Sequence, residues 1–169
     1  MAAGLVFTLL LGLSFGLWDG ADACQLEVAD CDECTPGWAW YDGRCFLYVN
    51  VKQSWADAEK FCLSLEGHLA SMTSRNEYNF IRDLIYKASG KHTQTWVGAH
   101  DSAQKGTWFW SDGSKFAFDQ WSYGEPNNFG GNEHCMDINL FGRDHVNDDV
   151  CSKELPFICV RPLYPSHAF

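Results

Sequence analysis

Residues 124–135, GEPNNFGGNEHC, form a stretch in which oxygen donors are closely spaced and apolar side chains are rare. Glu125, Asn127 and Glu133 all lie on this one bend, and Asn147 and Asp148 follow just before a later cysteine. Carboxylate and amide oxygens are the ligands that Ca²⁺ selects, and the set contains no soft donor. The five residues therefore predict a calcium site. A solvated polar loop, in which Asn, Asp and Gly serve only to form turns, is the alternative that composition leaves open.

The cysteines could hold these two segments together. There are eight, at Cys24, Cys31, Cys34, Cys45, Cys62, Cys135, Cys151 and Cys159. An even number in an exported chain indicates a disulfide framework, although spacing alone leaves ~105 possible connectivities. A bond between Cys135 and Cys151 would bring all five oxygen donors to one place. Zinc is the other use of cysteine, but CDEC is a single C-x-x-C without a second pair at ligand spacing.

The first 23 residues are typical of a signal peptide. The apolar run GLVFTLLLGLSFGLW is short for a membrane span, and Ala21 and Ala23 form an A-x-A pattern after it. We expect cleavage after Ala23 and an extracellular, secreted protein. An uncleaved anchor is the alternative, because no Lys or Arg precedes the apolar run. No other apolar stretch has membrane length, and a net charge of −10 without a basic cluster argues against a nucleic-acid partner.

Two helices are predicted ahead of the polar loop, over residues 54–67 and 74–90. Each begins at a serine with an acidic residue three positions on, and each ends at a glycine. The capping pairs are Ser54 with Asp57 and Ser74 with Glu77, and the terminating glycines are Gly67 and Gly90. The predicted buried faces are Trp55, Ala58, Cys62 and Leu65 on the first helix, and Ile81, Leu84, Ile85 and Ala88 on the second.

Short apolar runs predict strands around these helices. WAWYDGRCFLYV has Asp42-Gly43 between two such runs, which is a strong hairpin pattern. HLASM, TWVGA, TWFW, CMDINL and PFICV are the other strand candidates. Helices followed by irregular β structure favour an α+β fold. The long loop between Trp121 and Cys135 is of the kind that carries function in a compact domain.

The order of these features resembles the C-type lectin-like domain. The matching marks are the early Cys34 and Cys45, the two-helix segment with Cys62, WVG at 96–98, WFWSDGS, and Glu-Pro-Asn ahead of Asn-Asp and the last cysteines. The resemblance covers residues 34–162 and leaves 24–33 as a lead-in and 163–169 as a tail. It implies an α+β fold with two helices, two small antiparallel sheets, a long calcium-binding loop and disulfide staples.

The resemblance also implies the disulfide pairs, which are Cys34 with Cys45, Cys62 with Cys159, and Cys135 with Cys151. Cys24 and Cys31 are then left over. They pair with each other, or one of them bridges to a second chain in a homo-oligomer. We expect the internal pair, because the two are close in sequence and the count is even.

The family's calcium ligands map onto Glu125, Asn127, Glu133, Asn147 and Asp148, with the backbone carbonyl of Asp148 as a further donor. The Glu125–Pro126 peptide is implied to be cis. Glu125, Asn127, Glu133 and Asn147 would also contact the sugar. Glu-Pro-Asn is the family's mannose-type order, so mannose, fucose or N-acetylglucosamine glycans are the implied partners. The short secreted chain resembles soluble fish lectins, which implies innate recognition of microbial glycans.

Three departures from the family pattern concern this site. Val146 stands where the family has a Trp, and the segment between Glu133 and Asn147 is slightly longer than in mannose-binding relatives. An auxiliary calcium site seen in some members is not expected here. Asp101 matches it, but Lys105 and Asn128 stand where acidic ligands belong.

Other functions are weighed against the lectin. Type II antifreeze proteins share the resemblance, but here the sugar-type ligand set is complete and the loop has no Thr. A module that binds proteins without sugar is a third alternative. No enzyme is expected, since the chain has no Gly-x-Ser-x-Gly motif and no cysteine expected to be free as a nucleophile.

Overall fold

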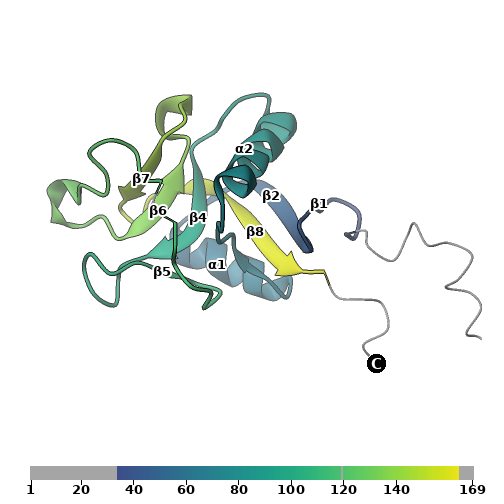
Figure 1. Cartoon of the computed structure of the whole chain (residues 1–169), viewed down its shortest axis with the longest axis horizontal. Coiled ribbons are helices and arrows are strands. Elements are labelled where there is room, and N and C mark those ends of the chain that lie inside the picture. Colours follow the sequence, from purple (N-terminus) through teal and green to yellow (C-terminus); the bar gives the residue numbers. More distant parts are fainter. Residues whose placement is uncertain (1–33, 119, 164–169) are drawn as a thin grey trace, which may run out of the picture. The chain divides into compact units, whose positions relative to one another are not determined.

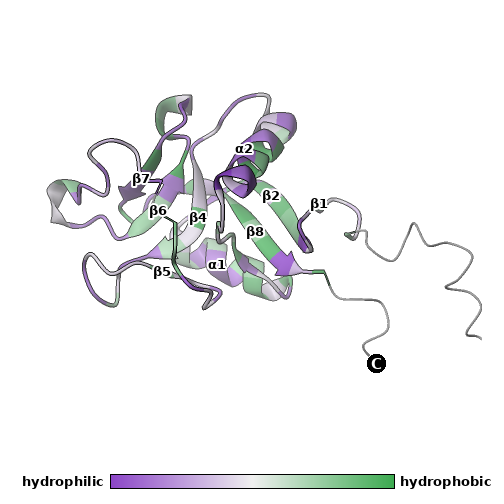
Figure 2. Cartoon of the chain, in the orientation of Figure 1, coloured by the Kyte–Doolittle hydropathy of each residue, from purple (hydrophilic) through white to green (hydrophobic). Residues whose placement is uncertain are grey.

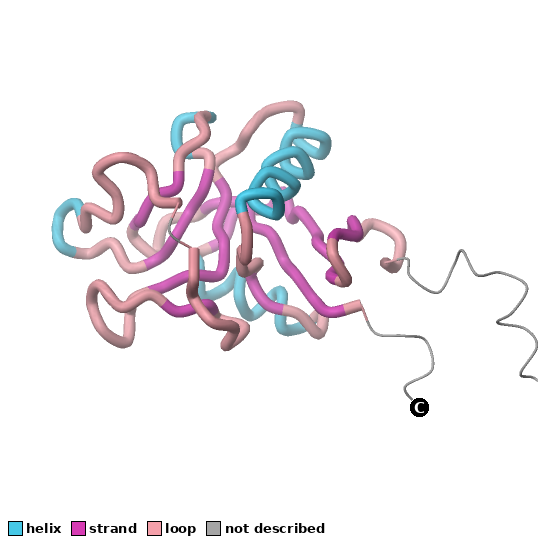
Figure 3. The backbone as a smooth tube through the Cα atoms, viewed as in Figure 1, coloured by secondary structure: helices cyan, strands magenta, loops and turns pink. Residues whose placement is uncertain are grey.

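The computed structural model describes residues 34–118 and 120–163. The predicted signal peptide, the lead-in with Cys24 and Cys31, and residues 164–169 lie outside this part. Two helices, α1 and α2, and eight strands make up the domain (Figures 1 and 3). The elements are β1 (Ala39–Tyr41), β2 (Arg44–Gln53), α1 (Trp55–Ser64), β3 (His68–Leu69), α2 (Arg75–Ser89), β4 (Thr95–His100), β5 (Phe109–Trp110), η1 (Phe129–Gly131), β6 (Cys135–Ile138), η2 (Leu140–Gly142), β7 (Val146–Asp149) and β8 (Leu155–Pro162).

The strands form one mixed sheet in the order β1-β2-β8-β4-β6-β7, with β3 added to β8 and β5 added to β4. All strand pairs are antiparallel except β4 with β8, which meet in parallel at Trp96 and Phe157. This single parallel pairing joins two antiparallel parts, which correspond to the two small sheets that the resemblance implies. The α+β fold class is confirmed.

The predicted hairpin around Asp42-Gly43 is present as β1 and β2, with Tyr41 opposite Arg44. Asp42 has φ 46° and Gly43 has φ 73°. A two-residue hairpin turn with positive φ at both positions matches the twist of the flanking strands, which is why Asp-Gly suits it.

Both helices begin where the serines predict. The Ser54 Oγ atom accepts a hydrogen bond from the N–H of Asp57, and Ser74 Oγ accepts one from the N–H of Glu77. Gly90 ends α2 with φ 76°, as expected. Gly67 does not end α1, however.

The first left-handed residue after α1 is Glu66, with φ 59°. Gly67 has another role, because a Cβ atom at this position would lie 2.5 Å from the carbonyl oxygen of Val160 on β8. It therefore allows two backbone segments to approach closely, which helix-ending rules do not anticipate.

The buried face of α2 differs in part from the prediction. Ile81 and Ile85 are buried, but Ala88 is exposed and the buried stripe begins earlier, at Glu77 and Tyr78. Glu77 tolerates burial because its carboxylate forms an ion pair with Arg44 and accepts hydrogen bonds from the N–H and hydroxyl groups of Thr73.

Apolar side chains of α2 and of strands from both parts of the sheet, including β4, β6 and β8, build the main core. Figure 2 shows β8 as largely hydrophobic. Three disulfides reinforce the domain: Cys34–Cys45, Cys62–Cys159 and Cys135–Cys151. These are the three pairs that the resemblance implies. Neither helix in the described residues is long and apolar enough to cross a membrane.

Candidate functional site

The polar loop of residues 122–134 leads from the core into β6 and lies beside the end of β7 (Figure 1). The β6–β7 register sets Met136 opposite Asp148, and the Cys135–Cys151 disulfide ties the end of the loop to the segment after β7. The Glu125–Pro126 peptide bond is cis, as the resemblance implies. The β6–β7 hairpin therefore positions the loop against the second group of predicted ligands.

Asp148 is the centre of this arrangement. Its side chain is fully buried, and its two carboxylate oxygens accept hydrogen bonds from the backbone N–H groups of Asn127 and Asn128, at 2.8 and 2.9 Å. Glu125 Oε2 also accepts from the N–H of Asn127, at 3.0 Å. The structure thus brings Glu125, Asn127 and Asp148 together.

Glu133 folds back over the same loop. Its Oε2 atom accepts a hydrogen bond from the N–H of Phe129 at 2.6 Å, and its own N–H donates to Asn128 Oδ1 at 3.1 Å. Backbone N–H groups of the loop therefore donate hydrogen bonds to all three candidate carboxylates, those of Glu125, Glu133 and Asp148. In residues 34–118 and 120–163, no three His, Cys, Asp or Glu side chains form a metal-binding group by themselves. A cation here would need side-chain amide oxygens of asparagine as further ligands. The carboxylates would have to give up hydrogen bonds from backbone N–H groups in order to bind it.

Asn147 is placed differently from the other candidates. It is buried on β7, and its Nδ2 atom donates to Oδ2 of Asp137 on β6, at 3.1 Å. Burial raises the pKa of Asp137 to about 8. The structure therefore pairs Asn147 with a strand neighbour and gives it no hydrogen bond to the loop. Asp137 was missed from the sequence, although an Asp within the apolar run CMDINL was a visible irregularity.

Negative charge is concentrated in the loop. Burial raises the pKa of Glu125 and of Glu133 above the ordinary value, and the nearby charge of Asp148 adds to both shifts. His145 Nε2 lies 3.5 Å from Glu125 Oε1. Crowded, partly buried carboxylates repel one another, and a divalent cation would offset this repulsion. The donors are all oxygens, so the residues present fit Ca²⁺.

Lys105 reaches the site from the loop after β4. Its Nζ atom donates to the carbonyl oxygen of Glu133 at 2.6 Å and lies 3.3 Å from Asp101 Oδ2 and 3.7 Å from Asp148 Oδ2. Burial alone would raise the pKa of Asp101, but hydrogen bonds from Gly106 and His134 and the charge of Lys105 lower it. A lysine ammonium thus lies between two buried carboxylates, at the place where the family pattern would require acidic ligands.

The base of the loop is closed by Val146 and Ser122. The N–H of Val146 donates to Ser122 Oγ at 2.8 Å, and the N–H of Ser122 donates to the carbonyl of Val146 at 3.2 Å. Val146, which replaces the family's Trp, is buried in the main core. Ser122 gave no sign of this role in the sequence.

Comparisons with known proteins match residues 51–161 to the lectin C-type domain. The "Galactose-specific lectin nattectin" of Thalassophryne nattereri is 37% identical over 163 residues, which cover 96% of this chain and all of that protein. Among solved structures, "Herring Type II Antifreeze Protein" superposes with a TM-score of 0.72 at 30% identity, over 78% of this chain and 100% of that one.

A second solved structure, the "Ca2+-dependent type II antifreeze protein (Ca2+-free form)", gives a TM-score of 0.70 at 30% identity, over 76% of this chain and 99% of that one. These relatives are lectins and antifreeze proteins rather than enzymes. The family match spans more than half of the sequence. It begins within β2 and extends through both helices and the polar loop into β8. The chain belongs to the family of lectin C-type domains.

Proposed function

We propose that this protein is a calcium-dependent carbohydrate-binding lectin. The observation that carries the proposal is the convergence of Glu125, Glu133 and Asp148 on one bend through the amides of Asn127, Asn128 and Phe129. Solvated turn residues could form such a loop without crowding three carboxylates, whose mutual repulsion a bound divalent cation would offset.

The proposed ligands are Glu125, Asn127, Glu133, Asn147 and Asp148. Bound there, Ca²⁺ would supply coordination positions for two neighbouring hydroxyl groups of a sugar. The carboxylates of Glu125 and Glu133 accept hydrogen bonds from these hydroxyls, and the amides of Asn127 and Asn147 donate to them. The Nδ2 atom of Asn147 has a second hydrogen besides the one given to Asp137, so this donation is compatible with its strand contact.

Mannose-type specificity is the finer part of the proposal. It rests on the order Glu125-Pro126-Asn127, which sets an acceptor first and a donor second. Nattectin is named as galactose-specific, so the overall similarity to that protein favours the other sugar class. The residue order at the site is the more direct determinant, because it fixes which hydroxyls meet acceptors. Mannose, fucose or N-acetylglucosamine ends are therefore the proposed ligands.

Titration calorimetry tests the metal. We expect Ca²⁺ binding that Glu133→Ala and Asp148→Ala each abolish, while Asp83→Ala, which removes an exposed carboxylate on α2, has no effect. Retention of Ca²⁺ binding in both site variants would show that the metal does not bind at this loop. Sugar choice is tested by loading the protein on mannose-agarose and galactose-agarose and eluting with EDTA.

An ice-binding protein on the same fold is the second candidate. It is supported by the similarity to the herring antifreeze protein and by the exposed Phe129 and Tyr123 in the polar loop, with exposed fractions of 80% and 104%. An ice-shaping assay on the same sample separates the two. Ice shaping without mannose-inhibitable binding would favour the antifreeze function.

We also propose that the chain is secreted after cleavage behind Ala23 and takes part in recognition of microbial glycans. Cys24 and Cys31 are proposed to pair with each other, so that any homo-oligomer would be noncovalent. A single calcium site binds a monosaccharide weakly, and avidity normally needs several sites.

A further inference from the structure

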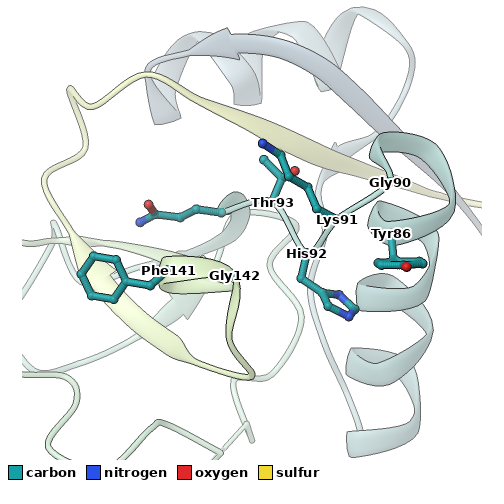
Figure 4. A pocket seen from close by; sticks show the side chains of 8 residues that line it. Tyr86, Gly90, Lys91, His92, Thr93, Phe141 and Gly142 are labelled. Carbon is teal, nitrogen blue, oxygen red and sulfur yellow. The ribbon is translucent and has the colours of Figure 1, made fainter.

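A pocket separate from the polar loop opens between the end of α2, the segment leading to β4, and the turn η2 (Figure 4). Its volume is about 560 Å³. This is within the range of roughly 300–1,000 Å³ that is common for small-molecule sites. The residues that line it are Tyr86, Gly90, Lys91, His92, Thr93, Gln94, Phe141 and Gly142.

Aromatic rings stand on two sides of this pocket. Phe141 and Tyr86 lie on opposite sides in Figure 4, and their exposed fractions are 83% and 52%. The ring of His92 lies beside Tyr86, with 5.1 Å between ring centroids. Single exposed apolar residues are normal on a protein surface, but aromatic rings that line the same cavity are typical of small-molecule sites.

Phe141 is also held in an unfavourable backbone conformation. Its φ is 55°, in the left-handed region that bulky side chains avoid. Phe141 belongs to the segment between Glu133 and Asn147, for which the family resemblance implies a slightly greater length than in mannose-binding relatives. Backbone strain at an exposed aromatic residue beside a pocket suggests a binding role.

The turn that carries Phe141 is fixed rather than loose. Asn139 is fully buried beneath it, accepts a hydrogen bond from Arg82 Nε at 2.8 Å and donates through Nδ2 to the carbonyl of Thr93 at 3.2 Å. Its N–H donates to the carbonyl of His145. These contacts join the turn to α2 and to the opposite wall, so the pocket is largely preformed.

The polar groups of the pocket suit hydroxyl groups. The lining includes the hydroxyl group of Thr93, the amide group of Gln94 and the ammonium group of Lys91, which can all form hydrogen bonds to hydroxyl groups. None of the lining residues is Asp or Glu. The last turn of α2 adds backbone carbonyls and the negative end of the helix dipole, which offset the positive charge of Lys91 and so favour a neutral ligand.

We propose that this pocket is a second, calcium-independent binding site for a neutral saccharide. The rings of Tyr86 and Phe141 would pack against the apolar C–H faces of pyranose rings, and the Lys91 ammonium group would donate a hydrogen bond to a hydroxyl. The proposal does not depend on the calcium site. If both sites bind sugar, a single chain can bridge two glycan strands without oligomerising.

Amide NMR of the ¹⁵N-labelled protein in EDTA tests the pocket directly. The probes are mannotriose, chitotriose and lactose, each titrated separately. We expect at least one of them to shift the amides of Gly90, His92 and Gly142. If none shifts them, the proposal is wrong. Because EDTA removes Ca²⁺, failure of the proposed calcium-dependent function would not affect this result.

Substitution at Phe141 adds a second criterion. Phe141→Asn removes the ring but accepts a positive φ, so we expect unchanged or higher thermal stability and saccharide binding in EDTA weaker by about tenfold or more. Phe141→Tyr should retain binding. Trp40→Ala, which removes an exposed aromatic on β1, is the matched control and should change nothing. Equal affinity of Phe141→Asn and wild type would overturn the assignment.

Discussion

Lys105 is a residue with two opposing effects on the candidate calcium site. Its ammonium group contacts the carbonyl of Glu133 and lies within 4 Å of the buried carboxylates of Asp101 and Asp148. It therefore offsets negative charge and orders the loop. The same positive charge competes with a divalent cation for Asp148.

Replacing Lys105 by Met should separate these effects. In EDTA we expect a loss of about 1–2 kcal/mol in the free energy of unfolding, because a charged hydrogen bond to Glu133 is removed and two buried carboxylates lose a partner. Calcium should then raise the melting temperature more in Lys105→Met than in wild type. Scanning calorimetry with and without Ca²⁺ measures both quantities.

Lys60→Met is the control, since Lys60 pairs with the exposed Asp57 at 3.5 Å on a helix surface. Its effect should be close to zero. Equal calcium-induced shifts in Lys105→Met and wild type would show that Lys105 has no influence on the metal.

Asp137 gives the protein a specific dependence on pH. Its folded-state pKa of about 8 lies above the ordinary value of 3.8, because the side chain is buried. Between these two values the folded state holds a proton that the unfolded state has released. Stability from this group is therefore complete below pH 4 and declines as the pH rises toward 8, by up to about 1.4 kcal/mol per pH unit.

Asp137→Asn should remove this dependence. We expect the unfolding free energy of wild type minus that of the variant to fall steadily from pH 5 to 7.5 in EDTA. Urea unfolding at several pH values measures it, with Asp83→Asn as a matched control that changes an exposed carboxylate in the same way. A difference that is constant with pH would mean that Asp137 is ionised throughout.

Among the elements, the polar loop uses its backbone to hold its shape and its side chains to select the ligand. Its backbone amides bind the carboxylates of Glu125, Glu133 and Asp148, and its side chains provide the order of acceptor and donor around Pro126. Because Asn127 takes part in these bonds through its backbone N–H, its side chain can change without removing them, and a side chain at 125 that keeps an oxygen acceptor can retain the bond from the Asn127 N–H.

The double change Glu125→Gln with Asn127→Asp tests this division. It keeps the total charge and keeps an acceptor at position 125, but it reverses the positions of carboxylate and amide. We expect weaker mannose binding and new galactose binding, with each mispaired hydroxyl costing ~1 kcal/mol or more. Competition of mannose and galactose against a labelled glycan measures the shift. Galactose preference already in wild type would contradict the proposed specificity.

Sequence patterns predicted where the helices and the hairpin lie better than they predicted how these elements pack against distant parts of the chain. Local rules were enough for the Asp42-Gly43 hairpin and for the helix starts at Ser54 and Ser74, because the deciding contacts lie within a few residues. Gly67 was misjudged as the end of the first helix because its role depends on the close approach of Val160, which is distant in sequence. Ala88 was misjudged as buried because periodicity does not show where the packed face of α2 stops.

The candidate site shows the same limit. The resemblance named the oxygen donors that meet on the loop, since their order along the chain is itself the pattern. It did not reveal that Asn147 pairs with Asp137, or that Ser122 closes the loop. Those contacts follow from the register of β6 and β7, which no local motif specifies.

At the scale of the whole molecule, the disulfide bonding of Cys24 and Cys31 decides whether two chains, and therefore two sets of binding sites, are covalently linked. We expect Cys24 and Cys31 to pair within one chain, because they are close in sequence and the other six described cysteines are already bonded. The mature protein should then run as a monomer in non-reducing electrophoresis. A dominant dimer band that disappears on reduction would show an interchain bond instead.

Strand β8 has a further consequence for how the protein is made. It is the last strand of the chain, yet it lies between β2 and β4 and also pairs with β3. A nascent chain that ends before Leu155 therefore lacks the strand that joins both halves of the sheet, and Cys62 has no Cys159 to bond with. The two halves of the sheet can therefore be joined only after nearly all of the domain has been synthesised, and until then its apolar strands lack their central partner.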